Sequence, residues 1–281
     1  MRILGALDGN SYSFNILKDL ALLCANTWAD TTLLIVCNEK DISDPEKLLQ
    51  EYAKSFYHFI GEKDGPYKIP KTIKITKTSG GELLFKTKGI KEFVLKLALI
   101  KDPAKEILKQ AKELDADLIV LGCSKGMDCE WQGVVGLPYK IARDANCSVL
   151  IIKESTDPRQ ITSFLDQSNV SQESLELINQ MVTIHDAGLK IVGLMGDKGV
   201  VGKDNVERKM LEILAYYNEK GMKAWITFIE KKEIEEYVAR ATNEGMVALW
   251  MGKKSFFSKI FSTNLLLKLI EHAKSSILIL R

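Results

Sequence analysis

Three glycines punctuate a loop in the middle of the chain, between two apolar segments. Gly122, Gly126 and Gly136 follow the apolar run 118–121, and a second apolar run closes the stretch at 148–152. Continuous apolar runs separated by a helix are typical of parallel strands that are covered on both faces. In such sheets, a loop from the carboxyl end of a strand to the start of a helix offers free backbone N–H groups and the positive end of the helix dipole. Both favour an anion, phosphate above all.

A carboxylate stands at the end of the first apolar run in each half of the chain. Asp8 follows residues 2–7, and Asp166 follows residues 161–165. The first strand of a doubly wound sheet lies beside the fourth at the switch point, so each aspartate would face its loop across the crevice. There a carboxylate can accept hydrogen bonds from ribose or adenine. The structural alternative is an aspartate that caps a helix or closes a turn.

The strands and helices that must position these residues alternate along the first half. Short apolar runs predict buried strands, and apolar residues at helical spacing predict the helices between them. Ser43 or Asp44 before Pro45, and Asp102 before Pro103, provide the cap and first-turn proline that open a helix. The predicted strands are 2–7, 31–37, 94–100, 118–121 and 148–152, with helices at about 14–27, 45–59, 103–114 and from about 136.

The second half repeats this series of strands and helices. Its predicted strands are 161–165, 190–195, 224–229, 246–251 and 277–280. Right-handed crossovers place helices on both faces of a parallel sheet. We therefore predict an α/β protein of two tandem doubly wound, Rossmann-like domains, each with a five-stranded parallel sheet. The domains are 1–154 and 160–281, joined by a short polar linker that contains a proline.

Residues 66–92 interrupt the first domain. Polar and apolar residues alternate in 71–77 and in 83–88, on either side of Ser79-Gly80-Gly81, which predicts an inserted β-hairpin. The turn also matches part of the SGG phosphate loop of ATP pyrophosphatases. We reject that interpretation, because Glu82-Leu83 replaces the final pair of the motif and no helix follows.

The composition is that of an ordinary globular protein and argues against several classes of partner. The 281 residues include 39 basic and 37 acidic side chains, so with a net charge of +2 no strong electrostatic field points to nucleic acid or anionic lipid. No apolar run is long enough to cross a bilayer and no secretory signal is recognisable, so we expect a cytoplasmic protein without membrane insertion. The five cysteines predict reduced thiols, and pairing of Cys123 with Cys129 in one loop is the alternative.

These features together resemble the universal stress protein family. The residues that carry the resemblance are LDGNS at 7–11, FLDQS at 164–168, DPAKEIL from Asp102, and DADLIVLG at 115–122. The resemblance covers nearly the whole chain apart from the insertion and the linker, and it is weaker in the second half. It implies the fold given above and a loop of the pattern G-x-x-G, nine residues, then G-[ST]. In family members that bind ATP, this loop holds the phosphates and ribose.

Both loops depart from the family pattern. Three residues instead of two separate Gly122 from Gly126, and Leu137-Pro138 stands where a hydroxyl side chain would meet phosphate. Loss of that hydroxyl removes one hydrogen bond to a charged group, worth roughly 1.5–3 kcal/mol, and Pro138 lacks an amide donor. In the second half the loop after Gly252 is shorter and has no later glycines.

The resemblance implies a nucleotide site in each half. The first comprises Ala6, Leu7, Asp8, Val36, Leu121, Gly122, Ser124, Lys125, Gly126, Gly136 and Leu137. The second, weaker site comprises Asp166, Gly252, Lys253, Lys254, Ser262 and Thr263. The lysines would pair with phosphate, the alternative being solvated loop side chains. The implied ligand is ATP or AMP, with Mg²⁺ accompanying ATP, and no structural metal is expected.

We therefore expect a regulatory module of the stress response that binds an adenine nucleotide, and not an enzyme. Histidines 58, 185 and 272 stand alone on predicted helices, without a nucleophile at a recognisable spacing. The expected partners are a second copy of the chain, or the other domain of the same chain, and an unknown protein. Two alternatives remain open: an interaction and dimerisation module whose sites have decayed, and a slow ATPase.

Overall fold

The structure, a computed structural model, divides into two compact units, Met1–Ser155 and Thr156–Arg281. Strands and helices alternate in both units, which confirms the predicted α/β class. The described residues are 1–37, 43–61, 65–79, 81–99, 102–123, 131, 136–153, 157–165, 171–195, 203–252 and 263–281.

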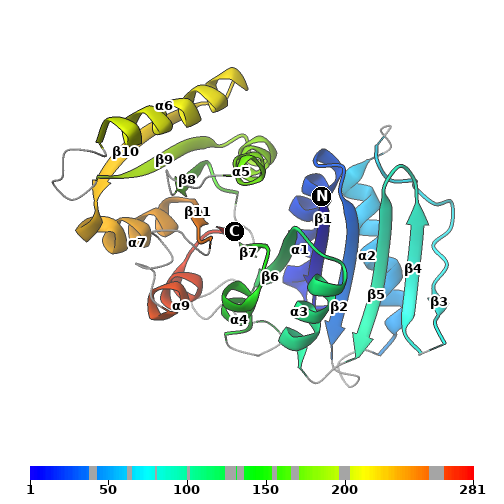
Figure 1. The fold of residues 1–281 in the computed structure, drawn as a ribbon. Helices are drawn as coiled ribbons and strands as arrows, with labels where there is room; N and C mark the ends of the chain where they lie inside the picture. The colour runs from blue at the N-terminus through cyan, green and yellow to red at the C-terminus, as the bar shows by residue number, and fades with distance from the viewer. Residues whose placement is uncertain are drawn as a thin grey trace. The chain divides into compact units, whose positions relative to one another are not determined.

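The sheet of the first unit is parallel except at one edge. Its strands are β1 (Arg2–Leu7), β2 (Asp30–Cys37), β3 (Thr76–Lys77), β4 (Leu83–Lys88), β5 (Glu92–Leu99), β6 (Leu118–Cys123) and β7 (Ser148–Lys153). Their order across the sheet is β7-β6-β1-β2-β5-β4-β3 (Figure 1). β4 pairs antiparallel with both β5 and β3, and the other pairs are parallel. The chain thus builds outward from β1 through β2 and β5, then continues on the other side of β1 with β6 and β7.

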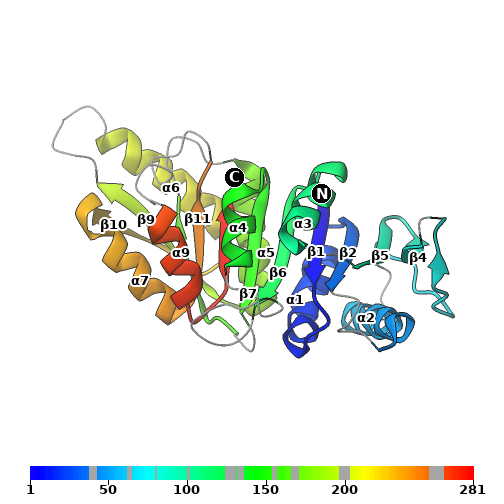
Figure 2. The ribbon, with the colours of Figure 1, turned by 90° about the horizontal axis from the view of Figure 1, so that it is seen from below.

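Two pairs of helices cover this sheet. They are α1 (Ser11–Asn26), α2 (Pro45–Ile60), α3 (Pro103–Glu113) and α4 (Leu137–Asp144). Figures 1 and 2 show α1 and α2 together on one face, with α3 and α4 on the other. The Asp44 carboxylate accepts a hydrogen bond from the Lys47 amide at 3.0 Å, and Asp102 accepts one from the Lys105 amide at 3.2 Å. Both predicted caps are therefore present, and they satisfy amides that have no partner within the helix.

The second unit has five parallel strands among its described residues. They are β8 (Gln160–Phe164), β9 (Gly188–Met195), β10 (Ala224–Glu230), β11 (Met246–Trp250) and β12 (Ile277–Leu280). The order β10-β9-β8-β11-β12 places the first strand third, as in the parallel part of the first unit. The helical segments are α5 (Gln172–His185), α6 (Lys203–Glu219), the short 3₁₀ helix η2 (Lys231–Glu233), α7 (Ile234–Glu244) and α9 (Thr263–His272).

The insertion forms less of a hairpin than its alternating sequence predicts. Of the expected strand 71–77, the structure pairs Thr76–Lys77 with β4. The start of the insertion is tied elsewhere, because the Tyr67 hydroxyl donates to the Ala29 carbonyl at 2.6 Å and lies 2.7 Å from Thr31 Oγ1. The chain then runs past α2 and reaches β4 only at Thr76. The anchor at Tyr67 is thus the reason for the shorter strand.

An aromatic cluster fixes the insertion to the first unit. Phe93 of β5 stacks on Phe56 of α2, with ring centroids 4.3 Å apart. Tyr57, Tyr67 and Phe85 surround Phe93, with ring centroids 5.3, 6.3 and 6.1 Å from it. All five rings are buried. The insertion is therefore part of the core of this unit and not a separate appendage.

Cys123, the last residue of β6, forms a disulfide bond, and its partner lies outside the described residues. The prediction of five reduced thiols is therefore wrong. It rested on the number of cysteines and the size of the core, and it gave too little weight to a cysteine at the start of a loop. Cys24, Cys37 and Cys147 are not disulfide-bonded. Burial raises the pKa of the Cys24 thiol to about 12, so this group stays protonated and unreactive.

The Glu176 carboxylate joins α5 to α6 in the second unit. It accepts hydrogen bonds from Asn179 Nδ2 at 3.0 Å, Gln180 Nε2 at 2.8 Å, the Tyr216 hydroxyl at 3.0 Å and Lys220 Nζ at 2.8 Å. Burial acts to raise the pKa of Glu176. The four hydrogen bonds, that from Lys220 foremost, outweigh burial and hold this pKa below its usual value.

Acidification should therefore loosen the second unit through Glu176. Because the pKa of Glu176 is lower in the folded chain, its stabilising contribution is complete above the ordinary value of 4.5. The contribution is lost as the pH falls through the depressed pKa. We expect Glu176→Gln to lower the unfolding midpoint at neutral pH and to flatten its acid dependence. Thermal unfolding from about pH 7 to about pH 3 measures both.

The matched control is Glu173→Gln, which changes an exposed carboxylate on the same helix. Because Glu173 lies in the first turn of α5, where a carboxylate interacts favourably with the helix dipole, we expect a small effect of at most about 1 kcal/mol, well below that of Glu176→Gln. An acid dependence that is equal in all three proteins would contradict the role given to Glu176.

Candidate functional site

The carboxyl ends of three neighbouring strands bring six of the predicted site residues together. β1 lies between β2 and β6, with Leu7 paired to Ile35 and Ala6 paired to Leu121. The direction in which strands are added reverses between β1 and β6. The crevice outside their carboxyl ends is therefore the topological switch point, where doubly wound sheets bind ligands. The six residues, all buried, are Ala6, Leu7, Asp8, Val36, Leu121 and Gly122.

Asp8 is held by hydrogen bonds from the start of α1. Its Oδ1 accepts from the Asn10 amide at 3.0 Å and from the Ser13 hydroxyl at 2.6 Å. Its Oδ2 accepts from Asn10 Nδ2 at 2.7 Å and from the Tyr12 hydroxyl. The residue is 5% exposed. Asp8 therefore closes the turn before α1, as the structural alternative predicts, and its carboxylate stays at the switch point.

A tyrosine of α2 completes the surroundings of this carboxylate. The Tyr52 ring stacks on Phe14 of α1, with centroids 4.2 Å apart. Its buried hydroxyl lies near Ser13 but makes no hydrogen bond of normal geometry to any described residue. Burial, followed by the negative charge of Asp8, raises the pKa of Tyr52 well above its usual value. The hydroxyl is thus a neutral donor, and leaving it unpaired in the interior is costly.

Gly122 has a packing role at the end of β6. A Cβ atom at this position would lie 2.7 Å from Cδ1 of Ile16 in α1. A larger residue would therefore have to displace the Ile16 side chain, which packs against this position. Gly122 makes room for Ile16, whether or not a ligand also approaches it.

α4 begins at the third glycine of the loop. Gly136 has a φ angle of +80°, a left-handed conformation that favours glycine. No side chain caps the helix, so the amides of Leu137 and Tyr139 have no partner within it, and Pro138 between them has no N–H. The Leu137 side chain is buried. This residue can therefore offer a ligand its amide but not its side chain.

Several predicted site residues lie outside the described residues. They are Ser124, Lys125, Gly126, Asp166, Lys253, Lys254 and Ser262. Of the second site, the structure describes Gly252 and the backbone of Thr263. Gly252 follows β11, where a Cβ atom would lie 3.1 Å from the Trp250 ring, and Thr263 opens α9. The second site stays a prediction.

Sequence reasoning missed the side chains that surround Asp8. Asn10, Tyr12 and Ser13 follow it within one helical turn, and polar residues at the start of a helix are a recognisable signal for hydrogen bonds of this kind. Tyr52 gave no such signal, because it occupies an apolar position of α2 and only the fold brings it to Asp8. Trp131 was also missed: it is fully buried, and its indole N–H has no partner among the described residues.

Within the described ranges, no group of three or more His, Cys, Asp or Glu side chains could hold a metal ion. No helix there combines the length and the apolar character needed to span a membrane.

The fold and the described part of the site define a class: doubly wound α/β domains, of which the first has the carboxylate of Asp8 and the glycine Gly122 at its switch point. The family model described as "Universal stress protein family" matches residues 1–153, which is more than half of the chain. The chain therefore belongs to the universal stress protein family. No curated protein matches the sequence.

Solved structures share the fold at low sequence identity. A universal stress protein from Archaeoglobus fulgidus is 15% identical with a TM-score of 0.57, over 100% of this chain and 96% of that one. A functionally unknown protein from Pseudomonas aeruginosa is 14% identical with a TM-score of 0.59, over 99% and 92%. The cytoplasmic domain of a prokaryotic cation chloride cotransporter is 10% identical with a TM-score of 0.53, over 99% and 94%. At these identities the similarity shows the fold alone.

Proposed function

We propose that the first unit binds an adenine nucleotide, ATP or AMP, and that the chain is a regulatory module of the stress response. The observation that carries the proposal is the position of Asp8, a buried carboxylate at the switch point between β1 and β6. Membership of the universal stress protein family supports it. The second unit has the same order of parallel strands, and we propose for it a weaker site of the same kind.

The residues at the switch point fit a nucleoside. A ribose hydroxyl or the adenine amino group can donate to Asp8 in place of Asn10 Nδ2 or the Tyr12 hydroxyl, which now bind Oδ2. The Tyr52 hydroxyl supplies a buried donor that lacks a partner among the described residues. In the complex, the ligand would replace Asn10 or Tyr12 as a hydrogen-bond donor to Asp8 and would accept a hydrogen bond from Tyr52.

The start of α4 fits a phosphate group, with fewer donors than the family pattern provides. The amides of Leu137 and Tyr139, which have no partner within α4, and the positive end of the helix dipole all favour an anion. Pro138 contributes no donor. We assign no residue of the chain to the Mg²⁺ that accompanies ATP, since no group of metal ligands was found in the described ranges.

Isothermal titration of the full chain with ATP and with AMP tests the proposal, with inorganic triphosphate as the control that lacks a nucleoside. We expect heat and a raised unfolding midpoint with at least one nucleotide, because a ligand that binds only the folded state stabilises it. Triphosphate alone should give a much smaller response. Neither heat nor protection with ATP or AMP would contradict the proposal.

A second candidate function is an interaction module whose nucleotide sites have decayed. The observation that favours it is that both Asp8 oxygens already accept two hydrogen bonds each from the chain itself. Such a module would work through dimerisation. Light scattering of the full chain, combined with the titrations, separates the two candidates: a dimer that ignores nucleotides supports the second.

A further inference from the structure

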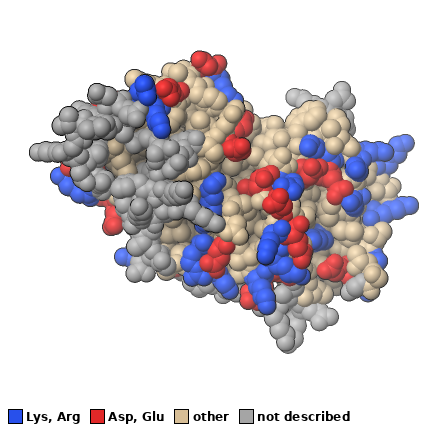
Figure 3. All heavy atoms as spheres, viewed as in Figure 1, with Lys and Arg blue, Asp and Glu red and all other residues tan. Residues whose placement is uncertain are grey.

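The insertion concentrates positive charge in a chain that is otherwise slightly acidic. Residues 66–92 contain seven lysines and two glutamates, a net charge of +5, so the rest of the chain carries −3 of the total of +2. Lys86 pairs with Glu92 at 2.8 Å, and Lys91 lies 3.7 Å from Asp30. The other five lysines form no ion pair within the described residues. Figure 3 shows basic side chains projecting from the edge of the first unit where β3 and β4 lie.

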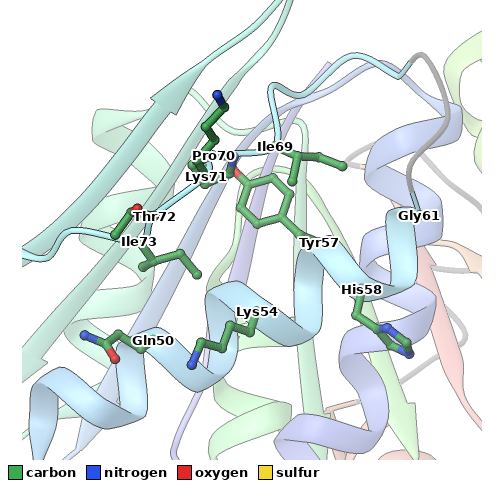
Figure 4. A pocket seen from close by; sticks show the side chains of 10 residues that line it. All are labelled: Gln50, Lys54, Tyr57, His58, Gly61, Ile69, Pro70, Lys71, Thr72 and Ile73. Atoms are coloured by element: carbon green, nitrogen blue, oxygen red, sulfur yellow. The ribbon is translucent and has the colours of Figure 1, made fainter.

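A groove lies beside these lysines, between α2 and residues 69–73. Its volume is about 690 Å³, within the range of about 300–1,000 Å³ that is usual for ligand pockets. Figure 4 shows Tyr57 reaching from α2 toward the segment and Ile73 pointing back toward the helix. The apolar lining residues are Tyr57, Ile69, Pro70 and Ile73, and the basic ones are Lys54, His58 and Lys71. Among the described residues that line the groove there is no carboxylate, so their electrostatic complement is an anionic ligand.

The segment that forms one wall of the groove has free backbone groups. From Lys71 to Ile75 the chain makes no backbone hydrogen bond to any described residue, because pairing with β4 begins at Thr76. The sequence of this segment alternates as a strand does, and after a bend at Lys71 and Thr72 the segment leads into β3, the edge strand of the sheet. A stretch with unpaired N–H and C=O groups is a template for another strand.

We propose that this groove binds an extended acidic segment of a partner protein, which adds a strand along Lys71–Ile75. Backbone hydrogen bonds to the free amides and carbonyls would hold the segment in register. Its apolar side chains would enter the groove beside Ile69 and Ile73, and its acidic side chains would pair with Lys54 and Lys71. At about 3.3 Å per residue, a segment of about five residues spans this wall.

The chemistry of the groove favours a peptide over the other polyanions. Nucleic acid in a groove of this kind would need exposed aromatic faces or a mainly polar lining. Tyr57 is instead buried, with its hydroxyl 2.6 Å from Thr87 Oγ1, and three of the remaining lining residues are isoleucine or proline. A membrane surface needs protruding apolar side chains, whereas Ile73 points into a concavity (Figure 4).

Lysines at a sheet edge also have a protective role, since they prevent pairing with the same edge of another copy. That role explains the charge but not an apolar groove beside it. The two accounts make opposite predictions for an acidic strand. A docking groove should bind it, whereas a sheet edge that is only protected by lysines should not.

Fluorescence anisotropy of the full chain tests the proposal. The probe is a fluorescein-labelled nine-residue peptide of alternating glutamate and valine; the comparison probes are a glutamate–serine peptide, a single-stranded oligonucleotide and phosphatidylglycerol vesicles. We expect saturable binding of the glutamate–valine peptide. The glutamate–serine peptide should bind at least about tenfold more weakly, because it lacks the apolar contacts.

Two pairs of variants locate the binding. Lys54→Glu with Lys71→Glu should weaken it about tenfold or more, since two attractions become repulsions. Lys105→Glu with Lys112→Glu, the same change on exposed residues of α3, should leave it unchanged. Thr72→Pro removes one free amide and should weaken binding, whereas Thr72→Ala should not.

Three results would overturn the proposal. The first is no saturable binding of the glutamate–valine peptide by a chain whose unfolding midpoint shows that it is folded. The second is equal loss of binding in the α2 and α3 lysine pairs. The third is binding of the oligonucleotide or the vesicles, in place of the peptide, that depends on Lys54 and Lys71. None of these results bears on nucleotide binding at Asp8, so the two proposals fail independently.

Discussion

Asp8→Ala should destabilise the first unit by about 3 kcal/mol and abolish the nucleotide response that we propose. The substitution removes the carboxylate that accepts four hydrogen bonds. The donors on Asn10, Tyr12 and Ser13 then lose their acceptor in a largely buried part of the structure. Each donor orphaned in the interior costs about 1–3 kcal/mol, and those that reach water recover part of that cost. Denaturant unfolding and titration with ATP and AMP measure the two effects.

Ser13→Ala is the control that separates stability from binding. It removes the two hydrogen bonds between Ser13 Oγ and Asp8, the one donated to Oδ1 and the one accepted from the Asp8 amide, and leaves the carboxylate in place. We expect a loss of about 2 kcal/mol, with the nucleotide response retained. If Ser13→Ala abolished the response as completely as Asp8→Ala, the carboxylate would have no separate part in binding. If Asp8→Ala kept the full response, Asp8 would be a structural residue alone.

Phe93→Ala should lower the stability of the first unit by about 3–5 kcal/mol, the usual cost of removing a large buried aromatic side chain. Phe93 is fully buried and touches rings from α2, from β4 and from the start of the insertion. The cavity left behind would loosen the attachment of the insertion. We therefore expect trypsin to cut after Lys71 or Lys74 sooner in this variant than in the unaltered chain.

Ile90→Ala provides the matched control for this substitution. Ile90 lies in the turn between β4 and β5, close to Phe93 in sequence, and it is 68% exposed. Its replacement should change stability by less than about 0.5 kcal/mol and leave the rate of cleavage unaltered. Equal effects of the two substitutions would show that the aromatic cluster does not hold the insertion in place.

The order of elements could be read from the sequence because each element carries its own signal. Asp44-Pro45 and Asp102-Pro103 open helices as predicted, since an aspartate cap and a first-turn proline act within a few residues. The position of Asp8 at the switch point followed from the strand order alone. Both inferences depend on local chemistry or on the handedness of crossovers, and these hold in most α/β sheets.

What the sequence could not give are contacts between residues far apart in the chain. The alternation in 71–77 predicted a strand, but Tyr67 is tied to Ala29 and Thr31, and that tie delays pairing to Thr76. Gly122 suggested a phosphate loop, whereas the space it leaves is filled by Ile16. In both cases the local structure depends on a contact with a residue far away in the sequence, and no local sequence pattern predicts such a contact.

The helix α2 has a consequence for both proposed sites at once. Tyr52 stands beside Asp8 and Tyr57 lines the groove, five residues further along the same helix, or about 7.5 Å at 1.5 Å per residue. Because α2 contributes a residue to each proposed site, a displacement of this helix at one site also displaces the residue at the other. Any coupling through α2 is reciprocal. The factor by which the nucleotide changes the affinity for the peptide equals the factor by which the peptide changes the affinity for the nucleotide.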